Sequence, residues 1–195
     1  IIVEIDNIAP GSVKATVSMG APVAGVKVKL IAIDSATGLP VVGREGGNIL
    51  GESEVETKAD TGGVVSFPLT QENYEGPVQL VAQGASATVV DASNLATTIS
   101  LPATFKLTSY VAHYKSGDAL DLPVTGWTSL ADAAVLAYAQ GRNPAQLTPI
   151  SIADAVAVID PLFSKHITTS PWNLRSTFPV SLTQTSQSLR DVVFA

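Results

Sequence analysis

Residues 20–34 read GAPVAGVKVKLIAID, and residues 52–69 read ESEVETKADTGGVVSFPL. In the first stretch apolar residues alternate with Lys27 and Lys29, which is the two-residue period of a strand with one buried face. The second stretch predicts three consecutive elements: a polar edge strand (52–59), a hairpin turn (60–63) whose glycines adopt positive φ, and a strand (64–69). The Gly-, Pro- and Asn-rich residues between the two stretches are expected to form an excursion between strands.

The same alternation recurs on both sides of these stretches. Further short strands are predicted at residues 1–5, 13–19, 77–82, 87–90, 97–104 and 105–114, the last of them ending the β-rich part. Several short strands at this spacing are typical of a sandwich of two sheets. We therefore expect a mainly β protein, with a β-sandwich of about seven strands over residues 1–115.

The pattern becomes helical after Gly117. Apolar residues at helical spacing predict a helix over residues 130–140, which Gly141 ends. Trp127 comes just before this helix, where its ring can pack against the first turn. We expect residues 116–195 to form a small helical subdomain on the end of the sandwich.

A second helix is predicted to begin at Ser151, whose side chain forms a capping arrangement with Asp154, and to stop near Pro161. A third helix is predicted near residue 185. It continues to the last residue without a C-cap, and the first residue is Ile rather than Met. We therefore expect the chain to be a processed piece of a longer protein.

The composition narrows the classes of function. The chain has 195 residues and a formal net charge of -6, with 46% hydrophobic and only 14% charged residues. Its 11 basic residues form no cluster, which argues against nucleic-acid binding. There is no cysteine, so disulfides and thiol catalysis are excluded, and no apolar run is long enough to span a bilayer. A surface of uncharged polar residues suits an extracellular or assembled protein, and the alternative is an ordinary soluble domain with few charges.

Two motifs resemble known bacterial families. The pattern P-V-A-G-x-x-V-x-L at residues 22–30, followed by T-x-A-D-x-x-G-x-V-S-F at residues 57–67, resembles carboxypeptidase-regulatory-like, CnaB-like and Ig-like surface domains. The pattern D-P-L-F-x-x-x-I-T-T-x-P at residues 160–171 resembles the tail of certain exported bacterial lipoproteins of unknown activity. The resemblance implies an Ig-like or CnaB-like sandwich that is secreted or attached to the cell surface as a binding or spacer module.

Some CnaB-like domains carry an isopeptide bond between Lys and Asn. The residues that this resemblance makes candidates are Lys14, Lys27 and Lys29, with Asn94 as the acceptor and Glu54 or Glu56 as the assisting carboxylate. The alternative is that these lysines are solvated residues on strand faces.

Calcium is the metal that the sequence best accommodates, because it needs only oxygen ligands. Asp118 and Asp121 lie in the segment SGDALDLP at the expected domain junction and are the candidate ligands. Turn and cap roles are the alternative for both residues. His113 and His166 have no partner at zinc-ligand spacing, and His113 is expected to be packed or at an interface rather than catalytic.

Four aromatic residues are candidates for ligand binding: Trp127, Trp172, Tyr110 and Tyr114. If their rings are exposed, they can stack on a carbohydrate. If the rings are buried, they join the helices to the sandwich.

No motif of a catalytic centre or of a nucleotide-binding loop occurs. We therefore expect a structural or interaction module for adhesion at the cell surface, without an enzymatic activity or a cofactor other than possible calcium. Its partner is expected to be a protein or a second copy. In one form of this hypothesis the N-terminal strand with Ile1, Val3 and Ile5 adds to a neighbour's sheet and builds a fibre. The alternatives are a carbohydrate- or ligand-binding module and an accessory domain of a larger secreted enzyme.

Overall fold

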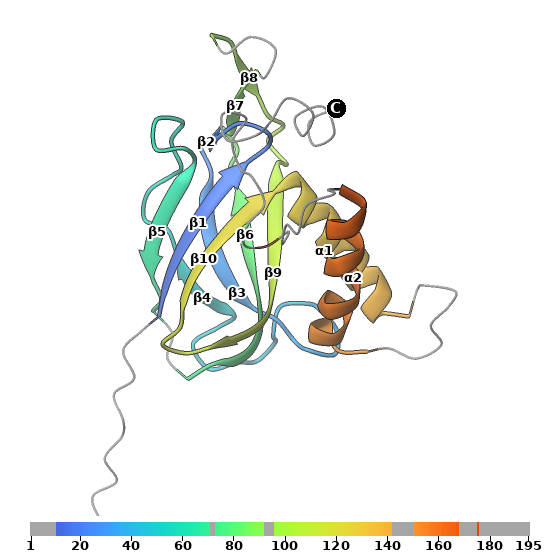
Figure 1. The fold of residues 1–195 in the computed structure, drawn as a ribbon. Coiled ribbons are helices and arrows are strands. Elements are labelled where there is room, and N and C mark those ends of the chain that lie inside the picture. Colours follow the sequence, from blue (N-terminus) through green and yellow to red (C-terminus); the bar gives the residue numbers. More distant parts are fainter. Residues whose placement is uncertain (1–10, 71–72, 92–95, 142–149, 168–174, 176–195) are drawn as a thin grey trace, which may run out of the picture.

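The computed structural model describes residues 11–70, 73–91, 96–141, 150–167 and Arg175, without the side chains of residues 165–167. This part of the chain holds ten strands and two helices (Figure 1). The strands are β1 (Ser12–Ser18), β2 (Val23–Ala24), β3 (Lys27–Ala32), β4 (Ile49–Glu52), β5 (Val64–Pro68), β6 (Glu75–Gln83), β7 (Thr88–Val90), β8 (Thr98–Ser100), β9 (Lys106–Lys115) and β10 (Ala119–Thr125). The helices are α1 (Gly126–Ala139) and α2 (Ile152–Ile167).

The strands form three sheets with the orders β10-β1-β5, β4-β3-β6-β9 and β2-β7-β8. The first two sheets enclose one apolar core, to which β1 contributes Val13, Ala15 and Val17 and β3 contributes Val28 and Leu30. These residues occupy every second position of their strands, because successive side chains of a strand point to opposite faces. The prediction of a mainly β protein with a C-terminal helical part is confirmed, and the arrangement is compatible with a β-sandwich.

The prediction that the strand at residues 105–114 is the last one is wrong. A further strand, β10, pairs with β1 in parallel, from Ser12 opposite Ala119 to Ser18 opposite Thr125. The signal for this strand is the alternation of leucines and valine in LDLPV, which also contains an acid and a proline typical of loops. Strand pairing therefore continues beyond residue 115, where the boundary between the two parts is expected.

The predicted polar strand at residues 52–59 is also wrong, except for Glu52 at the end of β4. The following residues still run along β3, but Ser53 and Thr57 hold them there with both backbone and side chain. The Ser53 Oγ accepts a hydrogen bond from the Val28 N–H at 3.0 Å, and the Thr57 Oγ1 accepts one from the Val26 N–H at 3.3 Å. Side-chain oxygens thus accept hydrogen bonds that backbone carbonyl oxygens would accept in a regular β-ladder.

The helices begin and end at recognisable caps. Thr125 caps α1 and forms a capping box with Thr128, so Trp127 lies inside the first turn rather than before the helix. Gly141, with φ of 67°, follows the last turn as predicted. In α2 the predicted cap is confirmed, since the Ser151 Oγ accepts a hydrogen bond from the Asp154 N–H at 3.2 Å.

The prediction that α2 stops near Pro161 is wrong, because the helix continues to Ile167 with this proline inside it. Phe163, which follows this proline, packs against a second apolar core that also holds Ile152 and Ile159, and this tertiary packing overrides local propensity. The predicted third helix lies outside the described residues.

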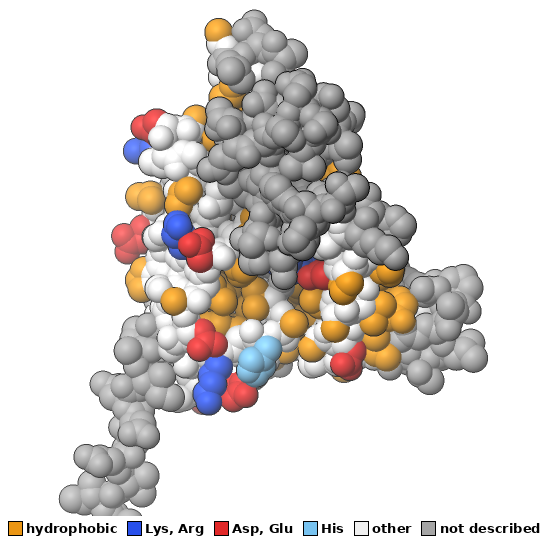
Figure 2. All heavy atoms as spheres, in the orientation of Figure 1, with side chains coloured by type: hydrophobic (Ala, Val, Ile, Leu, Met, Phe, Trp, Pro, Cys, Tyr) orange, Lys and Arg blue, Asp and Glu red, His pale blue; other side chains and the backbone are white. Residues whose placement is uncertain are grey.

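The second apolar core joins the helices to β9. It contains Tyr110 of β9 and Ile33 together with buried residues of both helices. On the outside of α2, Val158 and Leu162 are exposed, and apolar side chains gather over this part of the molecule (Figure 2). Within the described residues, neither helix is long and apolar enough to cross a membrane.

Candidate functional site

Of the four aromatic residues that the sequence makes candidates for ligand binding, the two tyrosines are buried. Tyr110 and Tyr114 are 2% and 1% exposed, so their ring faces are not available to stack on a sugar. The Tyr110 hydroxyl donates a hydrogen bond to the Gly38 carbonyl at 2.8 Å, and burial together with the charge of Asp132 raises its pKa to about 12. Trp127 is half-buried on α1, and Trp172 lies outside the described residues. Tyr110 instead belongs to the joint between the helices and the sheet.

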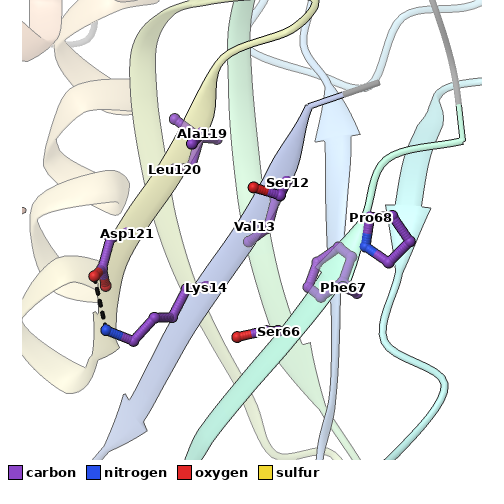
Figure 3. A pocket seen from close by; sticks show the side chains of 9 residues that line it. All are labelled: Ser12, Val13, Lys14, Ser66, Phe67, Pro68, Ala119, Leu120 and Asp121. Atoms are coloured by element: carbon purple, nitrogen blue, oxygen red, sulfur yellow. Dashed lines mark hydrogen bonds and ion pairs between the residues drawn. The ribbon is translucent and has the colours of Figure 1, made fainter. Parts of the chain in front are cut away.

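The two predicted calcium ligands bind different partners in the structure. Asp118 occupies the turn between β9 and β10, where its Oδ2 accepts a hydrogen bond from the Lys115 N–H at 3.0 Å. Asp121 lies on β10 and forms an ion pair with Lys14 of β1, at 2.8 Å (Figure 3). Within the described residues there is no group of three or more His, Asp or Glu side chains that could hold a metal ion.

The ion pair of Lys14 and Asp121 lies in an open groove on the outside of the sheet β10-β1-β5. Its neighbours across the groove are Ser12, Ser66 and Pro68 (Figure 3). Lys14, one of the isopeptide candidates, therefore has Asp121 as its ion-pair partner. The predicted isopeptide acceptor, Asn94, lies outside the described residues, as do Ile1, Val3 and Ile5 of the predicted strand exchange.

Replacing Lys14 with Met is expected to change the free energy of unfolding by less than about 1 kcal/mol. Both side chains of its ion pair are more than half exposed, at 52% and 65%, so water screens their attraction. Urea denaturation of the variant and of the parent chain measures the difference. A loss of several kcal/mol would contradict this assignment and give the pair a structural role.

Of the two placements expected for His113, the packed one is wrong and the one at an interface stays a prediction. The His113 side chain is exposed, and its Nε2 lies 3.7 Å from the Glu75 Oε1 on the neighbouring strand β6. The side chain of His166 is not among those described.

The most highly organised polar cluster lies along the outer edge of β9. Among the described strands only β6 pairs with β9, so the backbone groups of Thr108 and Tyr110 that point away from β6 need other partners. Side chains of α1 supply three of them. The Ser129 Oγ accepts from the Thr108 N–H at 2.8 Å, the Thr128 Oγ1 donates to the Thr108 carbonyl at 2.7 Å, and the Asp132 Oδ1 accepts from the Tyr110 N–H at 3.0 Å.

Arg175 completes this edge cluster. Its Nη1 donates to the Tyr110 carbonyl at 3.1 Å and to the Asp132 Oδ1 at 2.7 Å. Its Nε and Nη2 donate to the two carboxylate oxygens of Asp160 on α2, at 2.6 and 2.9 Å. One guanidinium thus connects β9, α1 and α2, using the forked geometry that suits Arg better than Lys.

The edge cluster is buried, and this sets its electrostatics. The side chains of Asp132 and Arg175 are 4% and 9% exposed. Burial raises the pKa of Asp132, while the charge of Arg175 and the hydrogen bonds of this carboxylate oppose the rise. Burial also opposes the charge on Arg175, but Asp132 and Asp160 together raise the pKa of its guanidinium above the ordinary value. Arg175 therefore stays charged and is the partner that makes the burial of Asp132 tolerable.

Sequence analysis did not find the edge cluster. Asp132 stands in an otherwise apolar helix, LADAAVLAYA, and this isolated charge is a usable signal for a buried or functional group. Its partner is 43 residues away, in a segment without periodicity, so no spacing connects the two.

Comparison with known proteins adds no relative. The chain matches no protein-family model, no curated protein and no solved structure.

Proposed function

We propose that the chain is a non-catalytic extracellular or cell-surface module, a structural spacer or interaction domain of the Ig-like or CnaB-like kind that residues 22–30 and 57–67 resemble. The observation that carries the proposal is the parallel pair of β1 and β10. The pair holds the first and last described strands of the sheets together over seven residues, in register from end to end.

This pairing suits a module through which tension passes. Because β1 and β10 are parallel, the chain enters the pair at Ser12 and leaves it at Thr125, at the opposite end. Tension between these two points acts along the strands, so the hydrogen bonds of the ladder resist it together rather than one after another. A spacer at a cell surface needs this resistance, whereas an isolated binding domain does not.

Single-molecule pulling tests the proposal, and the absence of cysteine lets two attachment points be introduced without side reactions. In the first variant Ser12→Cys and Gly126→Cys place the handles at opposite ends of the pair. In the second, Ser12→Cys and Ala119→Cys place them on register partners at the same end. We expect a clearly higher unfolding force from the first variant, because it loads the pair in shear while the second opens it one bond at a time.

The control is equilibrium unfolding in urea, which should be the same for both variants before handles are attached. Equal unfolding forces in the two geometries would argue against a spacer role. With equal forces, the β1–β10 pair would have no special role in resisting tension.

A further inference from the structure

The outer face of α2 is apolar, where a surface helix is ordinarily polar. Four apolar residues on this face are exposed and follow one another at the spacing of a single helix face: Ala157, Val158, Pro161 and Leu162. Val158 and Leu162 are 40% and 48% exposed, although the opposite face of the helix already packs in the second apolar core. A helix that is apolar on both faces is typical of a buried position, so we expect this outer stripe to be covered.

Charge and hydrogen bonding define what fits the outer stripe. Among the described residues of α1 and α2, Asp154 is the one exposed charged side chain, and it lies at the N-terminal end of the stripe. Pro161 has no N–H, so the Ala157 carbonyl lacks the hydrogen-bond partner that a helix supplies four residues later. A partner for this face therefore needs apolar side chains and one polar donor rather than a set of complementary charges.

We propose that residues 186–195 of this chain, here called the C-terminal segment, cover the outer stripe of α2 as an amphipathic helix. Leu189, Val192 and Val193 lie at the i, i+3 and i+4 positions of one helix face, and the two charged residues between them lie off that face. A segment of ten residues is too short to form a stable helix alone in water, so its helix needs a surface to form on. This inference is independent of the proposed spacer function.

Arg175 brings the C-terminal segment to the helices. Its guanidinium binds Asp132 of α1 and Asp160 of α2, so the chain is fixed at the helical part shortly before this segment begins. The ten residues 176–185 can span up to about 35 Å, whereas α2, with 16 residues, is about 24 Å long. The segment can therefore reach the whole stripe while Arg175 stays in place. A second copy has no such tether, so the segment of the same chain has the higher effective concentration at the stripe.

The test is a disulfide scan of the full chain, which the absence of cysteine allows. Val158→Cys or Leu162→Cys on α2 is combined with a second cysteine that replaces, in turn, each of residues 189–193. The variants are oxidised in dilute solution, and mass spectrometry measures the rate of intramolecular disulfide formation. We expect the fastest pairs to involve residue 189, 192 or 193, and to form about tenfold faster than any pair with residue 190 or 191. A segment that is only tethered would give all five positions about the same rate.

Ile99→Cys is the matched control, since Ile99 is 46% exposed, much like the two α2 residues, but lies on β8. Its disulfides with residues 189–193 should form slowly and at rates that do not depend on the position. The proposal is overturned if residues 190 and 191 react as fast as their neighbours, or if Ile99→Cys reacts as fast as the α2 variants. Disulfide-linked dimers as the main product would also overturn it and assign the stripe to a second copy. If one of the two α2 variants does not fold, the other decides the outcome.

Discussion

Replacing Arg175 with Met is expected to lower the free energy of unfolding by about 3–5 kcal/mol at neutral pH, the range for breaking a buried ion pair by removing one partner. The guanidinium has two carboxylates within 2.7 Å, and its side chain is only 9% exposed. Without it, Asp132 is left as a buried charge whose remaining partners are uncharged donors. Urea denaturation measures the loss.

A double replacement separates the ion pair from simple packing. Asp132→Asn keeps an oxygen for the Tyr110 N–H but removes the buried charge. We expect Arg175→Met combined with Asp132→Asn to be more stable than Arg175→Met alone. Arg44→Met is the control for losing an arginine, because Arg44 lies 5.3 Å from the ring centre of Tyr74, and this contact should cost only about 0.5–1 kcal/mol. Equal losses in Arg175→Met and Arg44→Met would contradict the assignment.

The deficit of Arg175→Met should depend on pH. Burial already raises the pKa of Asp132, and removing the positive charge should raise it further. A carboxyl whose pKa is raised by folding stabilises the folded state below its unfolded pKa, and this contribution is lost as the pH rises through the folded pKa. We therefore expect the variant to be closer to the parent chain in mild acid than at neutral pH. A deficit that is constant across this range would show that lost packing, rather than the buried charge, is responsible.

Replacing Gly63 with Ala is expected to cost about 2–5 kcal/mol, combining the strain of a left-handed backbone with that of overpacking. Gly63 has φ of 73°, and a Cβ atom there would lie 2.3 Å from the Val17 carbonyl oxygen. That oxygen belongs to the backbone of β1 and cannot move aside by a change of rotamer. Urea denaturation gives the size of the loss.

The neighbouring glycine provides the matched control. Gly62 has φ of 70°, but nothing lies within 4 Å of its Cβ position. Gly62→Ala should therefore cost only about 1–2 kcal/mol, from backbone strain alone. If both variants lose the same stability, the contact with Val17 does not matter and the prediction for Gly63 is wrong.

This turn shows what local sequence predicts and where it stops. The pattern Asp-Thr-Gly-Gly predicted positive φ at residues 62 and 63, and both glycines have it. It also predicted a hairpin between adjacent strands, and this is wrong. The turn leads from a segment that runs along β3 to β5, which pairs with β1 in a different sheet. Residue 63 requires Gly more strictly than residue 62, because only residue 63 lies against the backbone of β1.

In the candidate site, too, some features are predicted by local sequence and others depend on the tertiary structure. The side-chain classes at Tyr110 and Asp132 are visible in the sequence, but the local pattern leaves both an exposed and a buried role open for the ring of Tyr110. Its burial depends on where α1 and α2 pack. Arg175 has no local pattern at all, and its importance appears only where β9, α1 and α2 meet.

By itself the sequence determined in outline most of the described β-strands between residues 12 and 115, the positive φ of the glycine turn, the helix predicted at residues 130–140 and the cap at Ser151. These features depend on side-chain period and backbone preference, which act over a few residues. The tertiary structure decided that β10 pairs with β1, that α2 continues through Pro161 and that Arg175 joins Asp132 to Asp160. Such contacts connect residues up to about a hundred positions apart, and their free energy arises only when the whole chain closes around its cores.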